Sequence, residues 1–155
     1  GNIGGEEGSH CFNPANNYQL RWYEKQQLSI KPLELQTPRT FVLNGVNDYR
    51  RDGSSVGELV VLRLEYYGSE TQGWDFYVGY NRATGINRGV NAKPEYVDTV
   101  TVVMKLEGGM YGNGKTERWD IPVGKSYTIN RPVPDVPDVY IDFRSIHNGG
   151  KDAIV

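Results

Sequence analysis

The side chains that most often bind zinc or act as nucleophiles are scarce in this chain. It has two histidines, His10 and His147, and one cysteine, Cys11. A hydrolytic zinc site is built most economically from two histidines four residues apart on a helix, with a glutamate between them as general base. No His-Glu-x-x-His pattern occurs, and the two histidines are widely separated. The sequence therefore predicts no catalytic residue, no metal ligand and no cofactor of its own. We expect His10 to pack near a helix and His147 to lie in a C-terminal turn.

Nucleophilic and acid–base chemistry find little support either. No Gly-x-Ser-x-Gly elbow occurs, and Cys11 lacks an evident base. The carboxylate pairs Glu6-Glu7 and Asp135/Asp138 could hold a hard cation or serve as a glycosidase acid and base. Charges in turn-rich segments are more often solvated, and we expect that here.

Aromatic side chains gather around one predicted hairpin, which makes binding a more plausible activity than catalysis. Aromatic faces stack on sugar rings or anchor a protein partner. Tyr67, Trp74 and Tyr77 are the candidate aromatic binding surface. The alternative is structural: Tyr66, Trp74 and Tyr80 fill the core while Tyr67 and Tyr77 cover the outer face of a sheet.

Composition narrows the class of partner. The chain has 155 residues, enough for one domain with a real core, and a net charge of −2 without a run of Lys or Arg. A basic stripe that could follow a phosphate backbone is absent, so nucleic acid is not an expected partner. No segment approaches the roughly 18 apolar residues of a membrane span.

Hydrophobic residues alternate with a period of two over much of the chain, which predicts strands. The clearest cover 58–67, 74–80 and 96–107, and the first two form a hairpin. Shorter candidates lie at 40–44, 115–121, 125–130 and 139–144. Turn signals rather than helices separate them, so we expect a mainly β fold, an antiparallel β-sandwich of about seven or eight strands.

One short N-terminal α-helix is expected to accompany the strands. Asn13 can cap it, and Pro14 occupies a first-turn position where its missing N–H costs nothing. The helix is expected to run to about Trp22, with Ala15, Tyr18 and Trp22 on one face. So short a helix is marginal alone and must dock either on the edge of the sandwich or on a missing domain.

Three segments resemble the gametolysin family of algal wall-digesting zinc metallopeptidases. Residues 11–23, Cys-Phe-Asn-Pro-Ala-Asn-Asn-Tyr-Gln-Leu-Arg-Trp-Tyr, are similar to the family's Cys-Phe-Asn, aromatic, Gln-Leu-Gly-Trp segment, with Arg21 in place of the usual glycine. Residues 43–49 and 77–87 are similar to later landmarks of the family.

The resemblance implies a position relative to an active site that this chain lacks. The family's zinc helix lies upstream, with a Met-Gly turn just before the Cys-Phe-Asn segment. Gly1, Asn2 and Ile3 would then form a pocket wall when joined to a catalytic half, and Cys11 would be an unpaired half of a disulfide. The residue type alone leaves a second interpretation of Cys11 open, a small buried hydrophobic side chain. Residues 1–30 are expected to be a remnant after the active-site turn that includes the helix, and 31–155 the β-sandwich domain.

On this resemblance the chain is a non-catalytic, secreted β-domain, inactive alone, with zinc present only in an upstream catalytic half. Its expected partner is that half or another protein. Three explanations stay open: a fragment of a metallopeptidase, one piece of a processed enzyme, or a β-domain reused as a structural subunit or as a protein- or carbohydrate-binding module, for example toward glycan or extracellular matrix.

Overall fold

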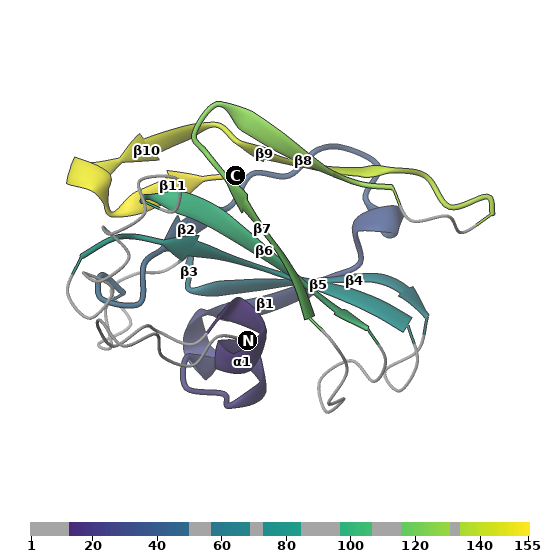
Figure 1. Cartoon of the computed structure of the whole chain (residues 1–155), viewed down its shortest axis with the longest axis horizontal. Helices are drawn as coiled ribbons and strands as arrows, with labels where there is room; N and C mark the ends of the chain where they lie inside the picture. Colours follow the sequence, from purple (N-terminus) through teal and green to yellow (C-terminus); the bar gives the residue numbers. More distant parts are fainter. Residues whose placement is uncertain (1–12, 50–56, 69–72, 85–96, 107–115, 131–133) are drawn as a thin grey trace.

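The protein folds into two β layers with a short helix on the outer side of one of them. The structure, a computed structural model, describes residues 13–49, 57–68, 73–84, 97–106, 116–130 and 134–155. In this part of the chain there are eleven strands and one α-helix, so the expected mainly β, sandwich-like fold with one short helix is confirmed (Figure 1).

A five-stranded sheet forms the middle of the molecule. Its strand order is β1-β4-β5-β6-β7. The strands are β1 (Gln27–Ile30), β4 (Val61–Gly68), β5 (Gly73–Asn81), β6 (Thr99–Leu106) and β7 (Thr116–Ile121). The pairs from β4 to β7 are antiparallel, and β4 with β5 forms the predicted hairpin. Only β1 runs parallel to its neighbour, β4, within this sheet.

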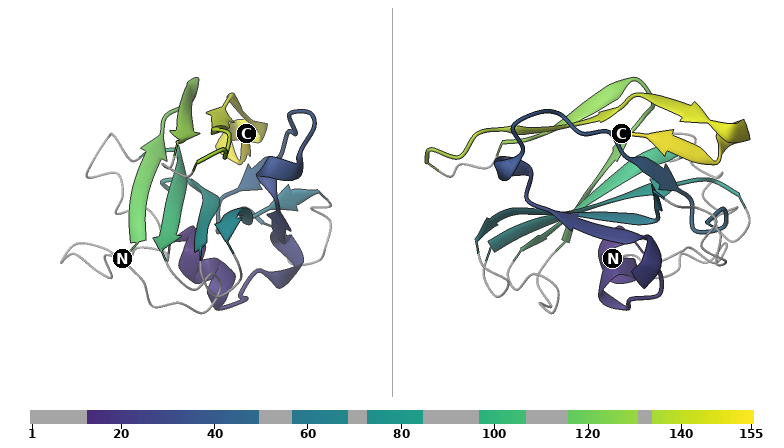
Figure 2. Two further views of the ribbon diagram at one scale, coloured as in Figure 1. Left: turned by 90° about the vertical axis from the view of Figure 1, so that its right-hand side faces the viewer. Right: turned by 180° about the vertical axis from the view of Figure 1, so that it is seen from behind.

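Two smaller sheets form the second layer over one face of the five-stranded sheet (Figures 1 and 2). One has the order β10-β11-β2-β3, and the other pairs β8 with β9. Their strands are β2 (Val42–Asn44), β3 (Glu58–Leu59), β8 (Lys125–Ile129), β9 (Val139–Phe143), β10 (Ser145–His147) and β11 (Asp152–Ile154). The main hydrophobic core lies between the layers, where Phe76 and Met104 of the large sheet belong to one cluster with Leu43, Ile129 and Phe143.

Helix α1 (Pro14–Gln19) covers the opposite face of the five-stranded sheet and packs on β4, β5 and β6 (Figure 1). The predicted cap is confirmed: Asn13 Oδ1 accepts a hydrogen bond from the backbone N–H of Asn16 at 3.0 Å. The predicted end is wrong. The helix stops at Gln19 because Arg21 adopts a left-handed conformation with φ 54°, and Trp22 is 55 % exposed rather than part of the buried face.

Three short strands escaped the sequence analysis: β1, β10 and β11. Each has three or four residues, too few for alternation to stand out, and each is defined by the neighbour with which it pairs. The pairs β1–β4 and β2–β3 are parallel, whereas the sequence predicted antiparallel packing.

The described part of the N-terminal segment 1–30 belongs structurally with the strands that follow it. Helix α1 packs on the five-stranded sheet, and β1 pairs with β4 in register Leu28 to Leu62. None of the helices in the described residues is long and apolar enough to cross a membrane.

The close approach of α1 to the sheet depends on Gly79 in β5. A Cβ atom at Gly79 would lie 2.7 Å from Cγ of Pro14, a separation that real Cβ contacts do not show. We therefore expect Gly79→Ala to lower the free energy of unfolding by about 1–3 kcal/mol, the usual cost of overpacking. Urea denaturation would measure it. Because the clash is with the Pro14 ring, Pro14→Ala should relieve part of the cost in the double variant; additive effects would contradict this packing.

Candidate functional site

The face of the five-stranded sheet beneath α1 carries charged side chains and is nevertheless buried. The sequence did not lead us to expect this burial. Tyr77 was expected to cover an outer, exposed face, but it is fully buried. The ring of Tyr18 from α1 lies over it, with ring centroids 5.4 Å apart. Val103 of β6 is buried in the same small cluster. Both faces of these central strands are therefore covered.

An ion pair between Arg63 of β4 and Asp75 of β5 forms the polar centre of this face. Nε and Nη2 of Arg63 donate to Asp75 Oδ2 at 3.2 and 2.8 Å, and the two side chains are only 7 % and 9 % exposed. Burial opposes the charge on Arg63, but the hydrogen bond and charge of Asp75 outweigh it and raise the Arg63 pKa. Because a buried charge is costly without its partner, this pair fixes the two strands and what lies on them.

The ion pair is linked to the helix and to the edge of the sheet. The Arg63 guanidinium lies 5.6 Å from the centroid of the Tyr18 ring on α1. It also lies 3.7 Å from Glu65, which accepts a hydrogen bond from Ser29 Oγ of β1. Burial, with the charge of Asp75, raises the pKa of the Tyr77 hydroxyl. The cluster thus ties α1, β1, β4 and β5 together.

Lys105 of β6 pairs in register with Asp75 and is only 4 % exposed. Burial lowers the pKa of its amine, and the charge of Asp75 opposes that shift. Within the described part of the chain, no salt bridge joins Lys105 to another residue. A buried amine beside a carboxylate is a feature of many active sites, but also of structural ion clusters.

A small cavity lies beside the cluster, between α1 and the sheet. Its volume is about 50 Å³, which is room for a few water molecules and not for a peptide or sugar substrate. It is lined by Asn13, Pro14, Asn17, Val46, Val60, Gly79, Tyr80, Asn81, Thr101 and Arg118. A cavity of this size can hold ordered water between the helix and the sheet.

Segments 43–49 and 77–84 meet in space. Arg82 Nη1 donates to Asp48 Oδ1 at 2.6 Å, and Asn47 Nδ2 donates to the Thr84 carbonyl at 2.7 Å. The hydrogen bond that Arg82 donates to Asp48 raises the Arg82 pKa. Arg82 Nη2 also donates to the Gly149 carbonyl near the end of the chain. Side chains of segment 43–49 therefore bind directly to residues of segment 77–84.

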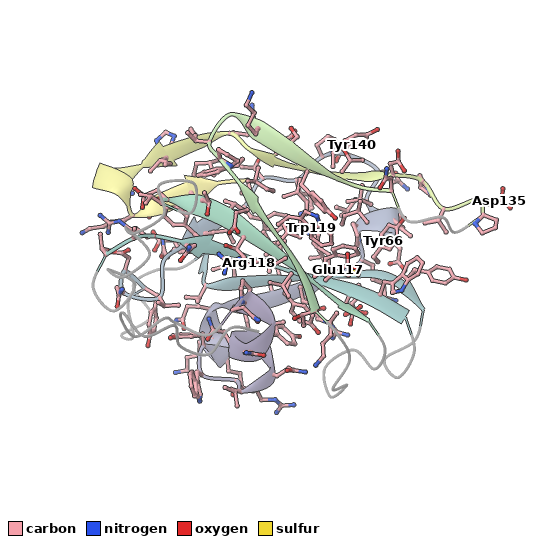
Figure 3. All side chains as sticks on the ribbon, viewed as in Figure 1. Tyr66, Glu117, Arg118, Trp119, Asp135 and Tyr140 are labelled. Atoms are coloured by element: carbon pink, nitrogen blue, oxygen red, sulfur yellow. The ribbon has the colours of Figure 1, made fainter. Side chains whose placement is uncertain are left out.

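Two of the three residues of the predicted aromatic surface lie together. Tyr67 is 50 % exposed, and its ring centroid is 6.3 Å from that of the half-buried Trp74. A register shift between Glu65 and Tyr67 sets Tyr67 opposite Trp74 at the end of the β4–β5 hairpin. Tyr77 does not join them, because it lies under α1. Figure 3 shows Tyr66 between the two layers, where it is buried.

The other predicted positions are distributed as follows. Gly1, Asn2, Ile3, Glu6, Glu7, His10 and Cys11 lie outside the described residues. His147 is the last residue of β10 rather than part of a turn, and its Nε2 lies 2.8 Å from Ser145 Oγ on the surface. Asp135 and Asp138 are exposed, as expected for solvated charges.

The buried ion pair was missed by the sequence analysis, although a signal existed. Arg63 and Glu65 of β4, Asp75 of β5 and Lys105 of β6 are charged residues within strands that are otherwise rich in apolar and aromatic side chains. Opposite charges at alternating positions of consecutive strands can face each other across a hairpin. Arg63, Asp75 and Lys105 are buried only because α1 covers them, and the pattern of residues within the strands does not predict that the helix docks there.

Comparisons with known proteins leave the family open. Neither a protein-family model, nor a curated protein, nor a solved structure matches this chain. Among the described residues, His, Cys, Asp and Glu do not gather in groups of three or more that could hold a metal ion.

The lowered pKa of Lys105 makes the free energy of unfolding depend on pH in a direction that can be predicted. Its folded pKa lies below the unfolded value of about 10.4, so between the two values the unfolded chain binds more protons and stability rises with pH. Below that window the cost of burying the charged amine is fully present. Lys105→Met should therefore unfold at higher urea concentration than the wild type at pH 7, and this advantage should shrink toward pH 10.

Lys125→Met is the matched control, because Lys125 is exposed on β8. Its urea midpoint should follow that of the wild type across the pH range. The titration of Tyr77 and Tyr80 is common to all three proteins and cancels in the difference. A Lys105→Met variant that is less stable at pH 7, with a parallel profile, would contradict a cost of burying the amine.

Proposed function

We propose that this chain is a non-catalytic β-module of a gametolysin-like zinc endopeptidase, and that it binds the zinc-containing catalytic unit rather than cleaving peptides itself. Its likeness to the family lies in segments 11–23, 43–49 and 77–87. The fold supports the proposal at two positions in these segments. At one the backbone has the conformation that the family pattern favours, and at the other two of the segments contact each other.

The observation that carries the proposal is the backbone at Arg21. This is the position at which the chain has arginine and the family pattern has glycine. Its φ of 54° lies in the left-handed region that glycine adopts without steric cost, and it follows directly on the C-cap residue Leu20. The helix therefore ends with the geometry that a Gln-Leu-Gly-Trp pattern favours, although this chain has arginine at the glycine position.

A second observation is consistent with it. The segments 43–49 and 77–84 are far apart in the sequence, and the ion pair of Asp48 with Arg82 joins them directly. Arg82 lies within the Tyr-Asn-Arg-Ala-Thr-Gly-Ile-Asn stretch, the more specific of the two landmarks. When two sequence patterns supply the two partners of one contact, that contact is a physical reason for both patterns to occur in the same protein.

The surface proposed for the catalytic unit is the chain reversal after α1. Leu20 and Trp22 flank Arg21 and are 48 % and 55 % exposed. Large exposed apolar side chains that lie close together in the sequence are typical anchors of protein interfaces. The reversal is held rigidly, because Arg21 N–H donates to the Tyr18 carbonyl and Tyr18 packs on Arg63 and Tyr77.

The test is binding to the His-Glu-x-x-His catalytic unit of a gametolysin-family endopeptidase from the same organism, produced separately and titrated by calorimetry. The double variant Leu20→Ser/Trp22→Ser should weaken the dissociation constant by about tenfold or more, since central apolar anchors commonly contribute over 1 kcal/mol each. Tyr140→Ser is the control, because Tyr140 is 66 % exposed and points outward from the second layer (Figure 3).

Two results would contradict the proposal. One is equal binding by the Leu20→Ser/Trp22→Ser variant and the wild type, or no binding at all. The other is stoichiometric zinc together with peptidase activity in the isolated chain, because the module would then be catalytic.

A carbohydrate-binding module is the second candidate, and the Tyr67–Trp74 pair favours it. Two aromatic rings held side by side at a hairpin end, one of them half exposed, form a platform on which a sugar ring can stack. Tyr67→Ala should then abolish retention on wall polysaccharide in affinity electrophoresis, while Tyr140→Ala leaves it unchanged. Retention that is equal in both variants, or absent in the wild type, would exclude this pair as a glycan site.

A further inference from the structure

The two edges of the five-stranded sheet are formed by its end strands, β1 and β7. Among the described residues, neither strand pairs with another strand on its outer side. β7 carries Glu117, Arg118 and Asp120, and charged side chains commonly protect a sheet edge against pairing with another chain. β1 has the sequence Gln-Leu-Ser-Ile, which contains neither a charge nor a proline. We propose that β1 is the interface at which two copies of this chain pair into one continuous sheet.

The backbone of β1 directs hydrogen-bonding groups to this edge. The Gln26 carbonyl accepts a hydrogen bond from Val60 N–H, on the side of β4, and Gln27 is extended with φ −125° and ψ 143°. Along an extended strand the N–H and C=O groups of successive residues point to opposite sides. Those of Leu28 therefore point toward β4, and those of Gln27 and Ser29 point outward. In the view from behind in Figure 2, β1 lies on the near side of the molecule. An open row of such groups is a template for a further strand.

The side chains of β1 give this edge an apolar face and a polar face. Leu28 lies in register with Leu62 of the main core and is nevertheless 36 % exposed. Ser29, on the opposite face, lies in register with Arg63 and donates a hydrogen bond to Glu65. A strand beside β1 would cover Leu28 if it placed an apolar side chain next to it. The strand that fits this edge therefore alternates apolar and uncharged polar residues.

A second copy of β1 is a strand of this kind. A twofold axis perpendicular to the sheet pairs the two strands antiparallel and keeps their faces, so that apolar side chains meet apolar ones. Centring the pair on Leu28 would bring Lys25 of one copy opposite Lys31 of the other, and like charges in this position repel. Centring it on Ser29 avoids that repulsion and places Leu28 opposite the partner's Ile30. The charges that flank β1 thus favour the register centred on Ser29.

Sedimentation equilibrium of the full chain tests this interface. The wild type should show a reversible monomer–dimer equilibrium at concentrations up to about 0.5 mM, a range that reveals dissociation constants of about 1 mM or tighter. Leu28→Lys should weaken the dimer about tenfold or more, because pairing would bury the new charge on the apolar face. Val123→Lys is the control, since Val123 is 49 % exposed between β7 and β8, and it should leave the dimer unchanged.

A charge swap at Ser29 tests the register, and its positive result requires folded protein. Ser29→Lys and Ser29→Glu should each be monomeric, because two identical charges would lie opposite each other at the twofold axis. An equimolar mixture of the two variants should form a dimer, since the facing charges are then of opposite sign.

The interface would be overturned by a wild type that stays monomeric throughout the concentration range, by a dimer that Leu28→Lys does not weaken, or by a mixture of the Ser29 variants that stays monomeric. A dimer lost in Leu20→Ser/Trp22→Ser but kept in Leu28→Lys would instead place the contact at the reversal after α1. A monomeric wild type whose binding to the catalytic unit is weakened by Leu28→Lys would assign the edge to that unit and not to a second copy.

Discussion

The structure depends on one constraint: the central strands of the five-stranded sheet are buried on both faces. The second β layer covers one face and meets Phe76, Val78 and Met104 with apolar side chains. Helix α1 covers the other and meets Tyr77, Val103 and the Arg63–Asp75 ion pair. A sheet covered on one side only would expose that ion pair to water, where it would contribute little. Once the pair is removed from water, loss of either partner leaves an uncompensated buried charge, and loss of the helix exposes the pair to water.

The helix can do this only because the sheet lets it approach. Gly79 leaves room for the Pro14 ring, and Asn13 caps the first turn, so six helical residues suffice to hold the contact. At its other end the left-handed Arg21 turns the chain sharply, and the exposed Leu20 and Trp22 project from that reversal. The start of this reversal is held in place because Tyr18, whose carbonyl accepts from Arg21 N–H, packs on Arg63 and Tyr77.

The region around the turn Asn148–Gly150 is held by polar contacts rather than by apolar packing. Polar side chains and backbone carbonyls from β2, the end of β5 and the turn Asn148–Gly150 are joined through Arg82, Asp48 and Asp152. This network links segments 43–49 and 77–84 to β11 and the turn Asn148–Gly150.

The sequence by itself determined the mainly β class, the β4–β5 hairpin, most of the longer strands and the Asn13 cap, because periodicity of two and capping chemistry are local properties. The tertiary structure decided the rest. It made the face with Tyr77, Arg63 and Lys105 an interior one, since only the docked helix distinguishes a buried polar face from a solvated one. It ended the helix at Gln19 through the backbone of Arg21, and it defined β1, β10 and β11 through their partners, because strands of three or four residues carry too little pattern to be recognised alone.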